Sequence, residues 1–126
     1  MKHLPLMAAA ALLVALALQP AGAAPSCRGQ WMHASWYGKE SCVNKSNCRT
    51  ANGERYTGAD LTAAHRTYAF GTKLRVTYNG HTAVVRVNDR GPAKWTGRDL
   101  DLSKAAAQKV GIYAPGVGKV CVEKVK

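Results

Sequence analysis

Acidic residues are scarce in this sequence, which has seven Asp and Glu against 18 Lys and Arg and a formal net charge of +11. A positive excess of this size predicts a polyanionic partner, a class that includes nucleic acid, an anionic membrane and a bacterial cell wall. Charge alone does not choose among these partners. Because acidic residues are few, each of their side chains can be considered in turn as a candidate for acid–base chemistry.

The chain also lacks the length, the internal repeats and the low-complexity segments of larger architectures. Its 126 residues suffice for one domain with a single modest core. Multidomain proteins, long repeat arrays and large cofactor-binding α/β folds are therefore excluded.

No hydrophobic run is long enough for a stable membrane anchor, which needs about 20 apolar residues. The apolar stretch 6–18 follows the basic start Met1-Lys2-His3 and precedes Ala21-Gly22-Ala23, an arrangement typical of a secretory signal peptide and its cleavage site. We expect residues 1–23 to be a signal peptide, with a buried N-terminal helix as the alternative. The protein is then exported and is not inserted stably in the membrane.

The exported domain is expected to comprise residues 24–126. It keeps a formal net charge of +10, because Lys2 is the one charged residue that the signal peptide removes. Pro25 stands close before Cys27, where a lipobox needs other residues, so we do not expect a lipid anchor. The expected location is the periplasm or the extracellular space, in association with the cell wall.

The four cysteines lack the paired spacing of a zinc site, so we expect no metal. An even number of cysteines in a small exported domain predicts two disulfides. Four cysteines allow three connectivities. The favoured one joins Cys42 to Cys48 across a short polar loop, and Cys27 to Cys121 at the two ends of the domain.

The remaining pattern is mostly that of β-structure. Asn79-Gly80 lies between two alternating segments and predicts a type I′ hairpin. Ser103 and Gly111 are suited to cap a short helix over 104–110. The predicted strands cover 31–37, 74–78, 82–87, 99–102 and 119–125, and residues 38–53 form a disulfide-held loop. About six short strands in a domain of this size suggest a small closed barrel, since closure removes exposed sheet edges.

Four acidic residues are candidates for catalysis, namely Glu54, Asp89, Asp99 and Asp101. The other three are expected in solvated or turn positions. Asp101 stands between Leu100 and Leu102, so in a strand its side chain points away from two apolar neighbours. For each acid alone, a structural or solvated role is the better interpretation.

His65 ends a stretch of small residues that leaves room around its imidazole, although a lone histidine is usually structural. Aromatic residues next to predicted loops could stack on sugar rings. Core packing is the alternative, more so for Trp36 than for Trp95. The aromatic residues in question are Trp36, Tyr37, Tyr56 and Trp95.

Six collinear motifs resemble the RlpA family, the rare lipoprotein A or septal lytic transglycosylases. They are Ala34-Ser35-Trp36-Tyr37-Gly38, Thr50-Ala51-Asn52-Gly53-Glu54, Leu61-Thr62-Ala63-Ala64-His65, Phe70-Gly71-Thr72, Val87-Asn88-Asp89-Arg90-Gly91-Pro92 and Asp101-Leu102-Ser103. The resemblance covers residues 33–125. It implies an all-β fold, a six-stranded double-psi β-barrel with one short helix.

The resemblance also implies a substrate and a site. The substrate is a peptidoglycan glycan strand, preferably stripped of peptides, cut at the bond from N-acetylmuramic acid to N-acetylglucosamine. The implied catalytic residues are Glu54, His65 and Asp89, with Asp101 in the position that related barrels use. We expect Tyr37, Thr62, Arg90 and Trp95 to contact substrate, and we expect no cofactor. The expected protein is a monomer.

This sequence departs from the founding family pattern in three respects. It has no convincing lipobox and no SPOR domain, so outer-membrane anchoring and septal targeting are not expected. The loop around Cys42 and Cys48 is an elaboration that the pattern does not contain. The alternative function is a non-catalytic, expansin-like binder of wall glycan. A nucleic-acid partner is not expected, because no motif for one is recognisable.

Overall fold

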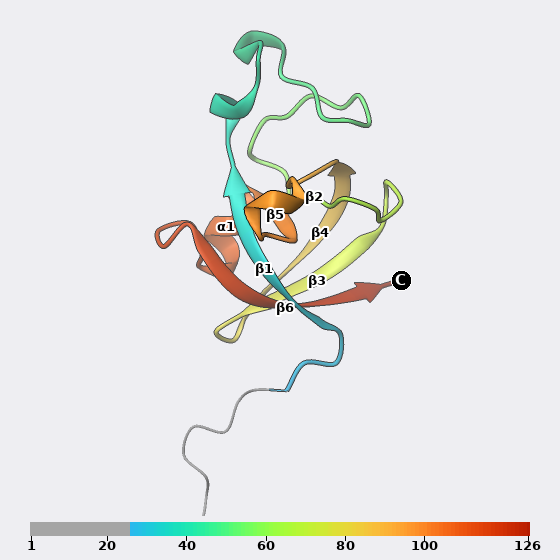
Figure 1. The fold of residues 1–126 in the computed structure, drawn as a ribbon, viewed down its shortest axis with the longest axis vertical. Helices are drawn as coiled ribbons and strands as arrows, with labels where there is room; N and C mark the ends of the chain where they lie inside the picture. Colours follow the sequence, from blue (N-terminus) through green and yellow to red (C-terminus); the bar gives the residue numbers. More distant parts are fainter. Residues whose placement is uncertain (1–25) are drawn as a thin grey trace, which may run out of the picture.

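The computed structural model describes residues 26–126, which form a closed six-stranded barrel with one short α-helix (Figure 1). The predicted signal peptide, residues 1–23, lies outside the described residues. The strands are β1 (Gln30–Tyr37), β2 (Thr62–Ala64), β3 (Lys73–Tyr78), β4 (His81–Asp89), β5 (Leu100–Ser103) and β6 (Val117–Val125). Three 3₁₀ turns, η2 (Lys39–Ser41), η3 (Lys45–Asn47) and η4 (Lys94–Thr96), and helix α1 (Lys104–Val110) complete the described elements.

The strand order around the barrel is β1-β5-β2-β4-β3-β6, and β6 pairs with β1 to close it. The pairs β1–β5 and β2–β4 are parallel, whereas the other four pairs are antiparallel. Closure gives the strands partners on both sides, which removes the edges that promote aggregation. The fold is therefore the mixed six-stranded barrel that the sequence predicted.

The hairpin β3–β4 follows directly from its sequence. Asn79 and Gly80 have φ values of 47° and 84°, which suits the tight turn predicted there. Alternate residues on both strands point into the barrel and are fully buried, among them Leu74, Val76 and Val85. The strand period of two therefore places one apolar face inside and one polar face outside.

Helix α1 covers the barrel core at one side. The Ser103 hydroxyl accepts a hydrogen bond from the backbone N–H of Ala106, 3.2 Å away, and Gly111 ends the helix with a φ of 94°. Ala106, Ala107 and Val110 face the core. The buried cluster combines them with side chains from all six strands: Met32, Ala34, Ala63, Leu74, Val76, Ala83, Val85, Val87, Leu100, Leu102, Ile112, Val120 and Val122.

The short strand β2 could not be identified from the pattern. Three residues are too few to show alternation, and all three are buried. The other strands are where the sequence placed them, most of them one or two residues longer, and α1 has the predicted bounds.

Both favoured disulfides are present. Cys27 pairs with Cys121 on β6, and Cys42 pairs with Cys48 within the loop after β1. Disulfides persist mainly outside the cytoplasm, so the domain is suited to an extracytoplasmic location. Within residues 26–126 there is no helix with the length and hydrophobicity needed to cross a membrane.

Candidate active site

A cleft of about 650 Å³, lined by both polar and apolar groups, opens at the barrel end where β1 and β4 finish. Ala64 and Asp101 from the barrel line it, together with residues of the segment between β4 and β5. Trp95, on η4, is 88% exposed beside the cleft. The other lining residues are Tyr37, Ser41, Arg90, Gly91, Pro92, Ala93, Thr96 and Arg98.

Asp101 is the acid whose carboxyl group lines this cleft. Its neighbours Leu100 and Leu102 are fully buried in the core, and the strand alternation turns Asp101 toward the opposite side, as predicted. The Ser35 hydroxyl, on the neighbouring strand β1, donates a 2.7 Å hydrogen bond to Asp101 Oδ1. Arg98 Nη1 donates in turn to the Ser35 hydroxyl at 2.7 Å.

Burial raises the pKa of Asp101 above its usual value, because desolvation disfavours the charged carboxylate. The hydrogen bond from Ser35 and the charge of Arg98 lower that pKa, while the charge of Asp89 raises it again. The net effect keeps Asp101 protonated to higher pH than a solvated aspartate. A protonated carboxylic acid in a cleft is able to act as a general acid.

Asp89, at the end of β4, lies close to Asp101. Ala64 on β2 pairs in register with both residues, so the two acids belong to the strands on either side of it. Three donors hold the Asp89 carboxylate. The hydroxyl of Tyr37 donates to Oδ2 at 2.9 Å, and the backbone N–H groups of Ala51 and Arg90 donate to Oδ1 at 2.8 and 2.9 Å.

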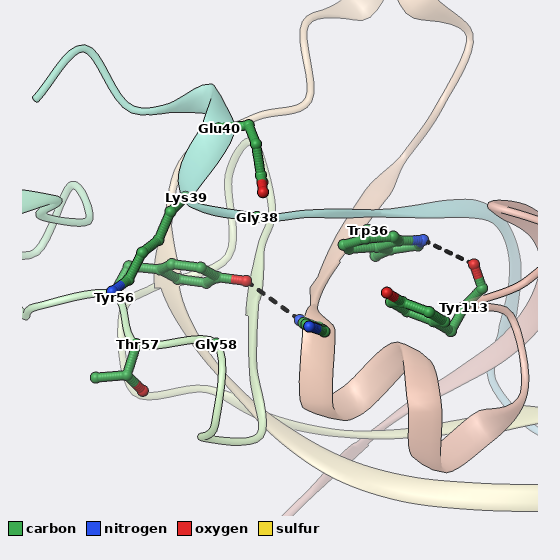
Figure 2. A pocket seen from close by; sticks show the side chains of 9 residues that line it. Trp36, Gly38, Lys39, Glu40, Tyr56, Thr57, Gly58 and Tyr113 are labelled. Atoms are coloured by element: carbon green, nitrogen blue, oxygen red, sulfur yellow. Dashed lines mark hydrogen bonds between the residues drawn. The ribbon is translucent and has the colours of Figure 1, made fainter. Parts of the chain in front are cut away.

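Tyr37 is itself held in place by contacts with Tyr56. Its ring stacks on that of Tyr56 with centroids 4.8 Å apart, and the Tyr56 hydroxyl donates to the backbone carbonyl of Tyr37. The backbone N–H of Lys104, the first residue of α1, donates to the Tyr56 hydroxyl (Figure 2). Burial, followed by the charge of Asp89, raises the pKa of Tyr37, so its phenol is a neutral donor to the Asp89 carboxylate.

Glu54 does not share this environment. Arg86 forms a two-pronged ion pair with its carboxylate, and the side-chain amides of Asn52 and Asn88 donate to it at 2.8 and 3.1 Å. The hydrogen bond from Arg86, followed by those from the two amides, lowers the pKa of Glu54 to about 2. Glu54 is therefore ionised near neutral pH and has no proton to donate.

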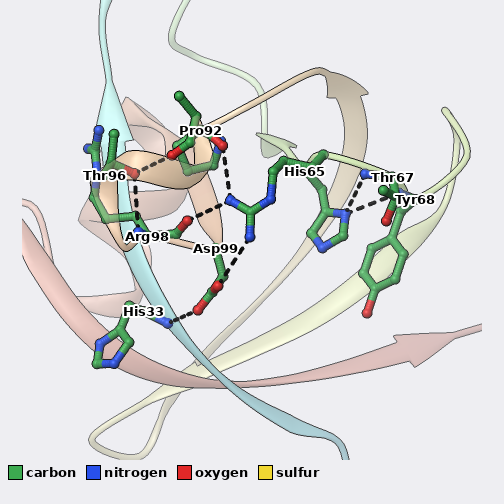
Figure 3. Close-up of polar contacts among 10 residues, drawn as sticks. His33, His65, Thr67, Tyr68, Pro92, Thr96, Arg98 and Asp99 are labelled. Atoms are coloured by element: carbon green, nitrogen blue, oxygen red, sulfur yellow. Dashed lines mark hydrogen bonds and ion pairs between the residues drawn. The ribbon is translucent and has the colours of Figure 1, made fainter.

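His65 follows β2 but does not line the cleft. Its Nδ1 accepts the backbone N–H groups of Thr67 and Tyr68 at 3.1 and 3.0 Å (Figure 3), and its ring stacks on Tyr68. Burial, with the charges of Arg66 and Arg90, lowers the pKa of His65. The imidazole thus fixes a turn, and the backbone N–H of His65 donates to the carbonyl of Asp89 at 3.2 Å.

The four predicted substrate-contact residues also divide into those that line the cleft and one that does not. Tyr37, Arg90 and Trp95 line the cleft, whereas Thr62 is buried in β2 and does not. Arg90 also lies over the Phe70 ring at 3.9 Å and donates to the carbonyl of Tyr68. Among residues 26–126, no group of three or more His, Cys, Asp or Glu side chains is arranged to hold a metal ion.

Sequence reasoning missed Ser35, which donates to Asp101, and Arg98, which donates to Ser35. Ser35 is 66 positions from its partner, and the parallel register of β1 and β5 brings them together. Ser35 belongs to the motif Ala34-Ser35-Trp36-Tyr37-Gly38, but nothing in that motif indicates that Ser35 bonds Asp101. No local signal marks Arg98.

A known protein family and known sequences resemble this chain over most of its length. The family model described as "Lytic transglycolase" matches residues 30–122. The "Probable endolytic peptidoglycan transglycosylase RlpA" of Synechocystis sp. is 50% identical over 95 residues, which cover 74% of this chain and 28% of that protein. The "Endolytic peptidoglycan transglycosylase RlpA" of Vibrio cholerae is 45% identical over 94 residues, 73% of this chain and 34% of that protein. The chain thus spans about a third or less of the length of these two relatives.

Two solved structures share the fold. The Streptomyces papain inhibitor has a TM-score of 0.59 at 23% identity, over 78% of this chain and 96% of that one. Cerato-platanin 3 of M. perniciosa has a TM-score of 0.52 at 15% identity, over 77% and 95%. At these identities the likeness extends to the barrel alone. The family match over residues 30–122 and the RlpA relatives show that this chain belongs to the lytic transglycolase family of RlpA-like double-psi β-barrels.

Proposed function

We propose that this domain is an endolytic peptidoglycan transglycosylase, which cuts glycan strands between N-acetylmuramic acid and N-acetylglucosamine. The observation that carries the proposal is the carboxyl group of Asp101, whose pKa is raised by burial, in an open cleft. The name of the Synechocystis and Vibrio cholerae relatives, endolytic peptidoglycan transglycosylase, supports the substrate class.

One acid suffices for this reaction. Asp101 gives its proton to the glycosidic oxygen as the bond to muramic acid C1 breaks and positive charge builds on that ring. The resulting carboxylate then accepts the proton of the muramic C6 hydroxyl, whose oxygen bonds to C1. The proton balance closes without water, and the product ends in a 1,6-anhydro ring.

Asp89, Glu54 and His65 act in this scheme as positioning residues. Asp89 holds the Tyr37 hydroxyl at the cleft. Glu54 anchors the turn whose Ala51 N–H binds Asp89, and His65 fixes the segment that meets the Asp89 backbone. Each therefore affects Asp101 through the shape of the cleft and not through proton transfer.

The cleft surface is suited to sugar. Tyr37 and the exposed Trp95 offer aromatic faces, while Arg90 and Arg98 offer donors. We propose that glycan stripped of its peptides fits best, that the protein works as a monomer in the periplasm or on the wall, and that its chemistry needs no cofactor. The high positive charge supports attraction to an anionic wall.

The alternative is a glycan binder that does not cut, and the exposed Trp95 at the cleft favours it, because such a residue suits stacking on a sugar ring. Digestion of purified sacculi, both intact and amidase-stripped, followed by mass spectrometry, separates the two functions. We expect products that end in 1,6-anhydro-muramic acid, in higher yield from stripped sacculi. Reducing ends would indicate a hydrolase. Absence of products, with the protein still bound to sacculi at high salt, would establish the binder.

A further inference from the structure

A second hollow adjoins the cleft at Asp101. Tyr37 and Ser41 line that cleft and also a second depression, of about 400 Å³, so the two hollows adjoin at these residues and are together termed the groove. The second hollow belongs to residues 38–49, here termed the cystine loop, which extends from the end of β1 beyond the barrel (Figure 1). Its further lining residues are Cys42, Val43, Asn44, Asn47, Cys48 and Arg49.

The cystine loop is held in one shape before any ligand arrives. The Cys42–Cys48 disulfide closes it, and Cys48 is buried. The backbone N–H of Tyr56 donates to the Cys48 carbonyl at 2.8 Å, which ties the loop to the following segment. The Asn44 side chain caps η3 by accepting from the N–H of Ser46. A preorganised loop binds without a large ordering cost.

The chemistry of the loop matches that of a sugar chain. Asn44 and Asn47 use their Oδ1 atoms inside the loop, and within residues 26–126 their Nδ2 groups make no hydrogen bond. Arg49 bonds Asn47 through Nε and Gly53 through Nη1. The remaining amide and guanidinium N–H groups are suitable donors to sugar hydroxyl, acetamido carbonyl and carboxylate oxygens. The side chain of Val43 is fully exposed beside them.

We propose that a glycan strand with its scissile bond at Asp101 continues over Tyr37 and Ser41 onto the cystine loop, which provides an added sugar-binding subsite. This inference rests on the proposed function, because it takes the substrate of the main cleft to be glycan. Trp95 then lies at one end of the groove and Arg49 at the other. The loop makes the domain selective for long strands, since a short one fills the main cleft alone.

The test measures binding of N-acetylglucosamine oligomers of three and six units by calorimetry, on the whole exported domain. The variant Asn47→Ala/Arg49→Ala removes two of the three donor side chains of the loop and leaves Asn44, which caps η3, in place. The matched control is Lys45→Ala, which removes a positive charge from the same loop at a residue that does not line the groove. Circular dichroism establishes that each variant is folded.

We expect the double variant to bind the six-unit oligomer about tenfold more weakly, the effect of losing one or two hydrogen bonds to a charged or amide donor. Its affinity for the three-unit oligomer stays unchanged, and Lys45→Ala behaves as the parent with both. Equal affinities of parent and double variant for the six-unit oligomer would overturn the subsite and leave the main cleft standing, as would an equal loss for both lengths. Failure of the parent to bind either oligomer would overturn the subsite, whereas the digestion of sacculi decides the glycan function itself.

Discussion

Asp101 and Asp89 are neighbours that differ in what surrounds their carboxyl groups. Asp101 accepts one hydrogen bond, from Ser35, and is desolvated enough that burial raises its pKa. Asp89 accepts three hydrogen bonds and is occupied in holding Tyr37 and two backbone segments. These surroundings are the basis of the proposed roles, Asp101 as proton donor and Asp89 as positioning carboxylate.

Replacing Ser35 with alanine tests this assignment through pH. The hydroxyl favours the charged form of Asp101 and so lowers its pKa; its loss raises that pKa further. Since the acid must be protonated to act, activity falls as pH rises through the pKa of Asp101. We expect the alkaline limb of the kcat/KM profile to move upward by about half to one pH unit in Ser35→Ala. Ser35→Thr keeps a hydroxyl and serves as the control, and an unmoved limb in Ser35→Ala would contradict the role of Asp101.

Glu54→Gln tests the ion pair with Arg86. Because the folded-state pKa of Glu54 is lowered to about 2 from an ordinary value of 4.5, its contribution to stability is present above about pH 4.5 and is lost as pH falls toward 2. We expect the variant to have a lower Tm than the parent at pH 7, by an amount equivalent to less than about 1 kcal/mol because the pair is partly exposed. The gap should close during acid titration followed by circular dichroism. A gap that is independent of pH would exclude this ionisation as its source.

At the residue scale, the sequence indicated which acids to consider but not how they differ. The alternation around Asp101 correctly predicted that it faces away from the core. Burial raises its pKa, while Ser35 and Arg98 lower that pKa, and the positions of these two residues follow from strand register and loop path. The state of Glu54 depends in the same way on Arg86, 32 positions away.

At the scale of elements, a helix or strand is predictable from the sequence when the residues that determine it lie within it or next to it. The β3–β4 hairpin and α1 carry their own turn and cap residues, so local chemistry predicts both. Strand β2 has three residues and owes its extended form to pairing with β4 and β5. The residues of such an element do not predict a strand by themselves, because the strand depends on pairing with segments that are distant in the sequence.

The two disulfides should differ in their effect on stability. The Cys27–Cys121 bond spans 94 positions and the Cys42–Cys48 bond spans six. Because a cross-link restricts the unfolded chain more when it closes a longer loop, removing the first by Ser replacement should cost about 4–5 kcal/mol and removing the second about 2 kcal/mol. Urea unfolding of the two double-Ser variants measures both. A larger loss from the Cys42–Cys48 pair would contradict this ordering.

At the scale of the whole molecule, we expect positive charge and the proposed sugar-binding cleft to make separable contributions to wall binding. Attraction through the net charge of +10 of the expected exported domain is screened by salt, whereas stacking on Trp95 is not. Co-sedimentation with sacculi should therefore fall between low salt and about 0.2 M salt and then level off. Trp95 is exposed, so we expect Trp95→Ala to leave the fold intact and to weaken the residual binding. Residual binding that is unchanged in Trp95→Ala would exclude Trp95 as a glycan contact.

The most direct test compares the parent with Asp101→Asn on amidase-stripped sacculi, with 1,6-anhydro-muramic ends counted by mass spectrometry. Asparagine keeps the size and the hydrogen-bond acceptor of Asp101 but has no acidic proton. We expect anhydro ends to fall at least a hundredfold, with sacculus binding retained and Tm at neutral pH equal to or above that of the parent, since a buried carboxyl group is removed. Release of anhydro ends at the parental rate by Asp101→Asn would show that another residue donates the proton.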